Sequence, residues 1–315
     1  MSFAVLYRNC YFALVVCLLV LTFASCNKQE QAAPAATAPQ TFTSPDQAGA
    51  ALLDAAKSGD PANVLAIFGS SAKDLVYSGD PAEDKAAFAG FVSDYDQMHR
   101  WRMLEEAKQL LLTGADNKVF PIPLVKSTNG NWSFDADAGK QEILARRIGR
   151  NELAAMDIVT AIAVAQMEYF AQHHDGTAQF AQRFISDEGK QNGLYWPPVE
   201  GKPQSPIGPL VAFASAEGLT LKPDSHQPFH GYFYRILDSQ GPDAKGGAKH
   251  YIVGGKMTGG FAVVAYPASY GDSGISTFTM SQQGVLYEKD LGKTTADLAG
   301  TLAAFNPDQS WKVVR

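Results

Sequence analysis

Asp157 is the residue of this sequence whose surroundings most suggest chemistry. It stands in an apolar run, one residue after Met156 and two before Val159. A carboxyl group buried among such residues must be paired or have a raised pKa, so Asp157 is either a site residue or half of an ion pair. Arg147 or Arg150 is the expected partner, and we favour this structural interpretation.

Three further side chains could serve a hydrolase that combines carboxylates with histidine. His230, Arg235 and Tyr266 fall on or beside predicted strands, where they could hold or move protons. His230 precedes Gly231, however, and a His-Gly pair at the start of a strand is also typical of a structural turn. The sequence has no nucleophile elbow, zinc-protease, phosphate-loop or dinucleotide motif, so we assign no catalytic or cofactor-binding residue.

Two aromatic residues form a candidate binding surface. Tyr195 and Trp196 precede Pro197 and lie in a proline-rich stretch, residues 189–218, which we interpret as a long loop. They could line a ligand groove or simply cover the core. The run from His173 to Asp175 suggests a metal site only weakly, because adjacent histidines point apart on a helix, so we predict no metal.

The element that must position these residues is a long helix predicted over residues 151–174. Its apolar residues form two stripes at helical spacing. The first stripe includes Leu153, Val159 and Met167, and the second includes Ile158 and Tyr169. Two stripes predict burial on two sides, so we expect this central helix to lie between the two halves of the protein and to touch both.

The part before the central helix, residues 42–149, reads as an α+β subdomain. Capping signals predict helices that begin after Ser44, Asp60 and Asp80, each followed by a proline. A strand is then expected over residues 119–125, and residues 128–131 form a hairpin turn to the next strand. Helices plus a small sheet are therefore predicted for this half.

The part from residue 150 to residue 315 is predicted to be a helix packed on an antiparallel meander. Glycine-rich connections separate strand candidates, and a helix is expected over about residues 295–305, before a last strand. The strands are expected over residues 231–237, 249–253, 261–266, 275–280, 285–288 and 311–314. One long helix on such a meander resembles the headgroup of type IV pilins and pseudopilins, although here the helix lies in the middle of the chain.

The first 26 residues predict export and lipid attachment. An uncharged, mostly apolar run from Cys10 to Ala24 is typical of a secretory signal, since it is short for a membrane span. Phe23 to Cys26 resembles the bacterial lipobox, with Phe23 where an aliphatic residue is usual; an ordinary cleaved signal is the alternative. We predict a signal peptide over residues 1–25 and a lipid-attached flexible tether over residues 26–41.

Composition restricts the partners. All three cysteines precede residue 27, so the body has no disulfide, cysteine nucleophile or thiolate zinc site. The formal net charge is −6 and the longest basic cluster is the pair Arg146-Arg147, which argues against a nucleic-acid partner. We expect the periplasmic face of a bacterial membrane, with Asn27 favouring the outer membrane, and an envelope protein or glycan as a further partner.

Several stretches together resemble a known family over almost the whole mature chain. They are residues 146–153 (RRIGRNEL), 193–197 (GLYWP), 228–232 (PFHGY), 255–261 (GKMTGGF) and 287–292 (YEKDLG). In these stretches the chain is similar to a bacterial family catalogued as domain of unknown function 2950. The resemblance implies an exported, often membrane-associated protein and supplies no activity or catalytic residue.

These observations leave three functions open. The first is an uncharacterised lipid-anchored envelope protein that binds or scaffolds without catalysis, and we prefer it. The second is an envelope hydrolase that uses carboxylate and histidine chemistry. The third is a pilus-like or secretion-system component, whose expected marker, a sustained apolar N-terminal stem, is missing from the sequence.

Overall fold

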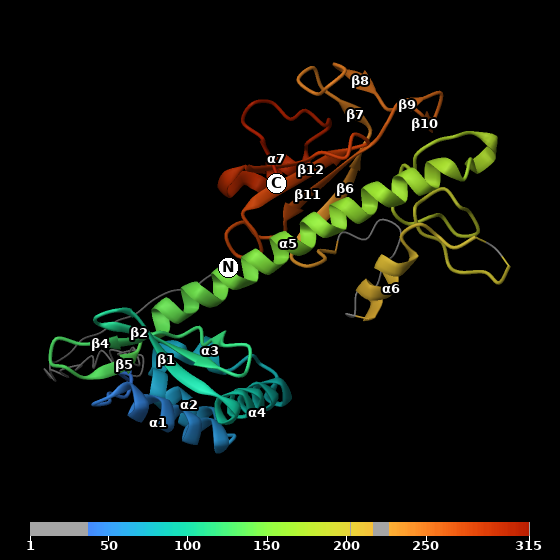
Figure 1. Cartoon of the computed structure of the whole chain (residues 1–315). Helices are drawn as coiled ribbons and strands as arrows, with labels where there is room; N and C mark the ends of the chain where they lie inside the picture. Colours follow the sequence, from blue (N-terminus) through green and yellow to red (C-terminus); the bar gives the residue numbers. More distant parts are fainter. Residues whose placement is uncertain (1–36, 202, 217–226, 315) are drawn as a thin grey trace, which may run out of the picture.

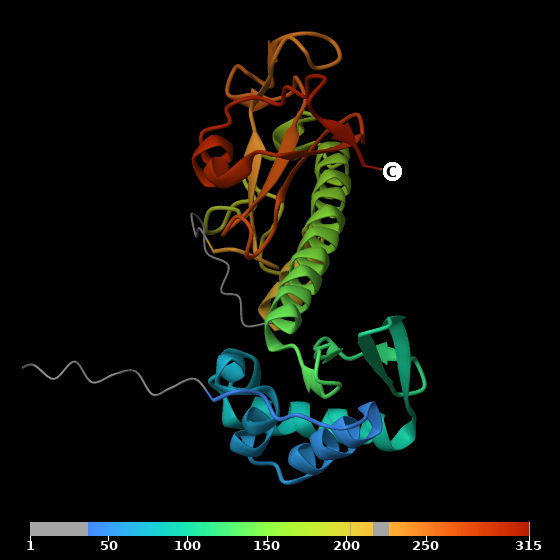
Figure 2. The same cartoon turned by 90° about the vertical axis from the view of Figure 1, so that its left-hand side faces the viewer.

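The protein is built around one 36-residue helix, α5 (Ala136–Ala171), with a hydrophobic core near each end. The computed structural model describes residues 37–201, 203–216 and 227–314. One subdomain lies at the start of α5 and the other lies along the rest of it, which makes the molecule elongated (Figure 1, Figure 2). The fold is α+β, as predicted, while Cys26 and the leader lie outside the described residues.

The N-terminal helices begin where the capping signals predict. Ser44 Oγ accepts a hydrogen bond from the Gln47 amide, and the carboxylates of Asp60 and Asp80 accept from the first turns of the next two long helices. Satisfying these free amides stabilises a helix start by about 1 kcal/mol. The elements are α1 (Pro45–Lys57), α2 (Pro61–Phe68), η1 (Ser70–Ala72), α3 (Lys73–Val76) and α4 (Pro81–Gln97).

A small antiparallel sheet completes this subdomain, with strands in the order β1-β2-β4-β5 and β3 beside β2. The strand predicted over residues 119–125 is interrupted in the structure. Pro121 and Pro123 cannot donate to a ladder, and they separate β3 from β4. The strands are β1 (His99–Glu105), β2 (Lys108–Thr113), β3 (Lys118–Val119), β4 (Leu124–Lys126) and β5 (Trp132–Phe134).

The C-terminal subdomain is the predicted meander, an antiparallel sheet of order β14-β13-β12-β11-β6. Helix α5 covers one face of it and α7 the other (Figure 2). The sheet consists of β6 (Tyr232–Leu237), β11 (Ala262–Pro267), β12 (Ser276–Ser281), β13 (Leu286–Asp290) and β14 (Lys312–Val313). Short ribbons pair β7 (Ser239–Gln240) with β8 (Lys249–His250), and β9 (Ile252–Val253) with β10 (Lys256–Met257). The prediction of a meander strand over residues 249–253 is therefore wrong, because the chain is interrupted at Tyr251, which is buried and donates its amide to the Asp238 carbonyl.

Two helical predictions for this half need correction. Helix α6 (Gly208–Ala216) occupies part of the stretch interpreted as loop, because the apolar residues after Pro209 bury Val211 and Ala214. Helix α7 (Thr295–Gly300) is shorter than predicted. Short 3-10 turns, η2 (His174–Gly176) and η3 (Gly292–Thr294), follow α5 and precede α7.

The central helix also differs from its prediction. It begins at Ala136, capped by Asp135, rather than at Asn151. Its second stripe is buried, but in the first stripe Leu153 and Met167 are 61% and 50% exposed. The helix therefore meets the two subdomains one after the other along its length, so that one side of its C-terminal half stays uncovered.

The residues around position 150 fasten α5 to the β11–β12 loop. Arg147 pairs with Asp272, and Asn151 Nδ2 donates to the Ser273 carbonyl at 2.8 Å. Glu152 Oε1 accepts from the backbone amides of residues 275 and 276, both at 2.9 Å. The RRIGRNEL stretch is thus a set of contacts between the helix and the sheet. By length and composition α5 could cross a membrane, but its buried face packs on this sheet.

Candidate functional site

An open groove runs along the uncovered side of α5. Its second wall is residues 206–210, which lead into α6 and form its first turn, and Ile207 and Leu210 pack in one hydrophobic cluster with residues of α5. The cavity volume is about 410 Å³, within the usual range for ligand pockets. Its lining residues are mostly apolar; they are Asp157, Thr160, Ala161, Val164, Ala165, Glu168, Pro206, Ile207, Pro209 and Leu210.

Asp157 lies in this groove, and its predicted burial is wrong. The side chain is exposed, and it forms no hydrogen bond or ion pair within the described part of the chain. Arg147, an expected partner, pairs with Asp272 instead. The apolar run around Asp157 is buried on the other side of the helix, so neighbours in sequence did not reveal the environment of this carboxylate.

Apolar side chains extend the groove along α5. Val164 is 64% exposed and Leu153, three helical turns earlier, is 61% exposed. Phe213 on α6 is also 51% exposed, but it lies outside the groove lining and contacts Phe229 and His230. Exposed apolar residues beside a groove mark a surface suited to binding.

Trp196 covers the core and does not line a groove. It is 4% exposed, and its indole Nε1 donates to the Pro203 carbonyl at 3.2 Å. Its ring meets His174 edge-on, with centroids 5.5 Å apart, and His174 stacks on Tyr169 at 4.1 Å. Burial raises the pKa of Tyr169 to about 12. Tyr195 is half-buried and is held by backbone hydrogen bonds to residues 184 and 186.

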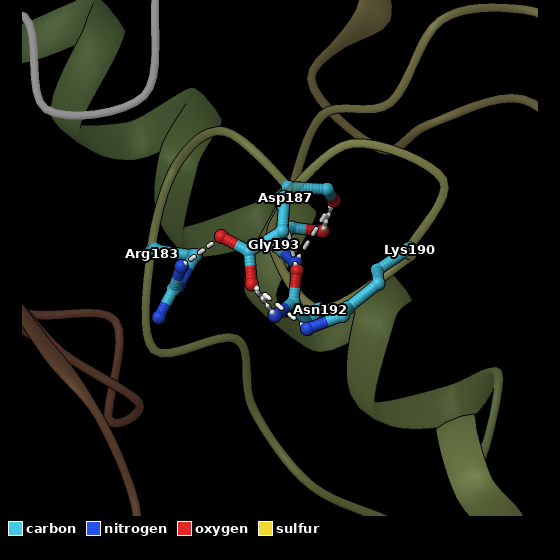
Figure 3. A network of polar contacts seen from close by, with 6 residues as sticks. Arg183, Asp187, Lys190, Asn192 and Gly193 are labelled. Carbon is cyan, nitrogen blue, oxygen red and sulfur yellow. Dashed lines mark hydrogen bonds and ion pairs between the residues drawn. The ribbon is translucent and has the colours of Figure 1, made fainter.

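A polar network closes the loop that carries these aromatic residues (Figure 3). The Asp187 carboxylate accepts from Asn192 Nδ2 at 2.8 Å and also pairs with Arg183 and Lys190. The Asn192 hydrogen bond is the main reason why the pKa of Asp187 lies below its ordinary value. Because every contact is made within residues 183–193, the network stabilises the loop itself.

We expect the stability of this region to depend on pH through His174. Burial lowers its pKa below the ordinary value of 6.5, so at a pH just below 6.5 the unfolded chain binds more protons than the folded one. We expect the free energy of unfolding to decrease as the pH falls below about 6.5, by less than about 1 kcal/mol for a partly exposed group. Urea unfolding at pH values between about 5 and 7.5 measures this.

His174→Gln is the matched variant for that measurement, since it cannot titrate. Its stability should decline less over the same pH range than that of the wild type. Equal declines in the two proteins would show that other groups cause the pH dependence.

His230 contacts the later part of α6, whereas the groove is lined by the first turn of this helix. Its backbone has φ 47°, which fits the turn before β6, and its ring stacks on Phe213 with centroids 5.8 Å apart. Phe229 contacts both rings. The structure thus places His230 beside Phe213, the exposed aromatic residue of α6.

Arg235 and Tyr266 lie on the face of the meander that α7 covers. The Arg235 guanidinium donates to the carbonyls of Ala299, Gly300 and Leu302, which caps the end of α7. Tyr266 is 6% exposed and packs on Phe233. Both side chains have structural contacts, and the described residues contain no group of three or more His, Cys, Asp or Glu that could hold a metal ion.

Sequence reasoning missed most of the groove. Val164 stands among buried residues, and its type does not distinguish it from a core position, whereas the charge of Glu168 was a signal of exposure. One signal was present for the second wall. Pro209 followed by an apolar run through residue 214 is the pattern of a helix with proline in its first turn.

Comparison with known proteins gives one match. The model of a family described as "Protein of unknown function (DUF2950)" matches residues 39–314. No curated protein and no solved structure matches the chain. The matched range contains both subdomains and the whole groove.

Proposed function

The chain belongs to the DUF2950 family, and from this premise we propose that it is a lipid-anchored cell-envelope protein that binds a partner without catalysis. The observation that carries the proposal is the open groove between α5 and α6, with its apolar walls and its unpaired Asp157. Such a surface can bury an apolar ligand and orient it by charge. Arg235 and Tyr266 have structural contacts, so the geometry does not favour the hydrolase alternative.

The anchoring part of the proposal rests on the leader and on Cys26, which precedes a tether rich in Gln, Ala and Pro. We expect wild-type protein to sediment with membranes and the full chain carrying Cys26→Ser to be soluble, because lipid on this cysteine is the proposed attachment. Fractionation at high salt measures the difference. A Cys26→Ser protein that still sediments with membranes at high salt would contradict lipid anchoring.

The binding part is tested with the soluble Cys26→Ser chain and Nile red, a neutral apolar dye. We expect the dye to bind, and binding to weaken about tenfold when the groove wall is made polar by Ala161→Gln/Val164→Gln, since both side chains are exposed and line the groove. Fluorescence titration gives the affinities. Ala145→Gln is the matched control, an exposed alanine of the same helix outside the groove.

Two outcomes would show that the groove is not a binding surface. Either the dye does not bind the parent chain, or it binds the wall variant and the control with equal affinity. The circular dichroism spectra of the variants must match that of the parent chain. Exposed alanine and valine positions of a helix accept glutamine without loss of fold.

A further inference from the structure

The groove combines apolar walls with two carboxylates, and these features select the kind of molecule that it binds. Resting on the proposed function, we propose that it binds an amphipathic helix of a partner protein that carries two basic side chains about three helical turns apart. The helix would lay its apolar face along α5, against α6, and place one basic residue near Asp157 and the other near Glu168.

The spacing of the exposed residues on α5 fits a helical partner. Leu153, Thr160, Val164 and Met167 are exposed and follow one another at intervals of seven, four and three residues. These intervals keep side chains on one side of a helix, as in helix-to-helix packing seams. The row covers about 21 Å of helix axis, which is the length of about four turns in a partner helix.

The charges at the groove require a cationic partner. Asp157 and Glu168 both line it and lie eleven residues apart on α5, which places them about 16 Å apart along the axis. Neither forms an ion pair among the described residues; Glu168 accepts only a 3.5 Å hydrogen bond from Gln172. Two unneutralised carboxylates beside an apolar floor favour Lys or Arg and repel acidic segments.

The second wall favours a helix over an extended segment. Residues 206–210, which lead into α6 and form its first turn, make this wall, and Ile207 anchors it in the core at 6% exposure. An apolar groove along a helix accepts an amphipathic helix through residues at positions i, i+3, i+4 and i+7. Neither wall is a sheet edge that could pair with an extended chain.

The test uses three synthetic peptides of about 18 residues, enough for five turns. All share leucines at helical spacing and differ only at two flanking positions eleven residues apart, which are Lys, Gln or Glu. Fluorescence anisotropy measures their binding to the full Cys26→Ser chain. We expect the Lys peptide to bind at least about tenfold more tightly than the Glu peptide, with a difference that shrinks as salt increases.

The matched variant Asp157→Asn/Glu168→Gln keeps the apolar walls and removes both charges. We expect it to bind all three peptides equally. Equal binding of the peptides to the parent chain, or an unchanged Lys preference in the variant, would overturn the proposal. If the peptide results overturn the proposal but Nile red still binds, the proposed binding function stands. Failure of the cationic-helix proposal is therefore distinguishable from failure of the proposed function.

Two other occupants give different results. Sedimentation that shows a dimer of the parent chain and a monomer of Ala161→Gln/Val164→Gln would identify the groove as a contact between copies of this chain. Binding of the Cys26→Ser chain to phosphatidylglycerol vesicles that the same variant loses would identify a lipid surface. Either result overturns the cationic-helix proposal.

Discussion

Gln166→Leu should lower the free energy of unfolding by about 2–5 kcal/mol. Gln166 is fully buried on α5, and its amide makes both hydrogen bonds of the Ala181 backbone. Its Nε2 donates to the Ala181 carbonyl and its Oε1 accepts from the Ala181 amide, each at 2.8 Å. Leucine fills similar space but leaves a buried donor and a buried acceptor unpaired, at a cost of about 1–3 kcal/mol each.

Urea unfolding of the two proteins measures this loss, and amide hydrogen exchange at Ala181 should become faster in the variant. Gln141→Leu is the matched control, because Gln141 is exposed on the same helix and should tolerate leucine with little change. A loss for Gln166→Leu no larger than that of the control would show that the loop around Ala181 is held by other contacts.

Gly274→Ala should destabilise the protein by about 2–3 kcal/mol through overpacking. A Cβ atom at this position would lie 2.5 Å from Tyr232 Cζ and still closer to its hydroxyl oxygen. Tyr232 has no exposed surface and donates to the Ser276 carbonyl at 2.9 Å, so it cannot move aside without losing packing and a hydrogen bond. Thermal or urea unfolding measures the loss.

Two further variants separate this contact from general effects. Tyr232→Phe removes the oxygen nearest the added methyl group, so the double variant should lose less stability than the sum of the two single variants. Gly149→Ala has nothing within 4 Å of its added Cβ and lies in α5, so it should stabilise the chain by up to about 1 kcal/mol. Additive losses in the double variant would contradict the clash.

The N-terminal helices show how much short-range chemistry reveals. Ser44, Asp60 and Asp80 each start a helix in the structure where their capping pattern predicts one. The strands that form the meander sheet were likewise predicted to within two residues at their ends, because apolar runs between glycines describe strands locally, whereas residues 249–253 belong to two separate ribbons. Interactions between residues three or four apart can be read along the chain without knowing the fold.

The long helix shows where that reading fails. Periodicity predicts a helix, but which of its two apolar stripes is buried depends on where the meander lies, and that is set by contacts across more than a hundred residues. Asp157 was expected to be buried because its neighbours are apolar, yet it faces outward. The direction of a side chain on a helix changes by about 100° per residue, so sequence neighbours do not share an environment.

By itself the sequence determined the class of fold, the starts of the three capped N-terminal helices, the strands of the meander sheet and the resemblance to one family. It also placed every cysteine before the folded body. The tertiary structure alone decided the groove between α5 and α6, the structural engagement of Arg235 and the buried pairing of Gln166 with Ala181. The physical reason is that capping and periodicity act over a few residues, whereas a groove exists only when elements distant in the chain pack side by side.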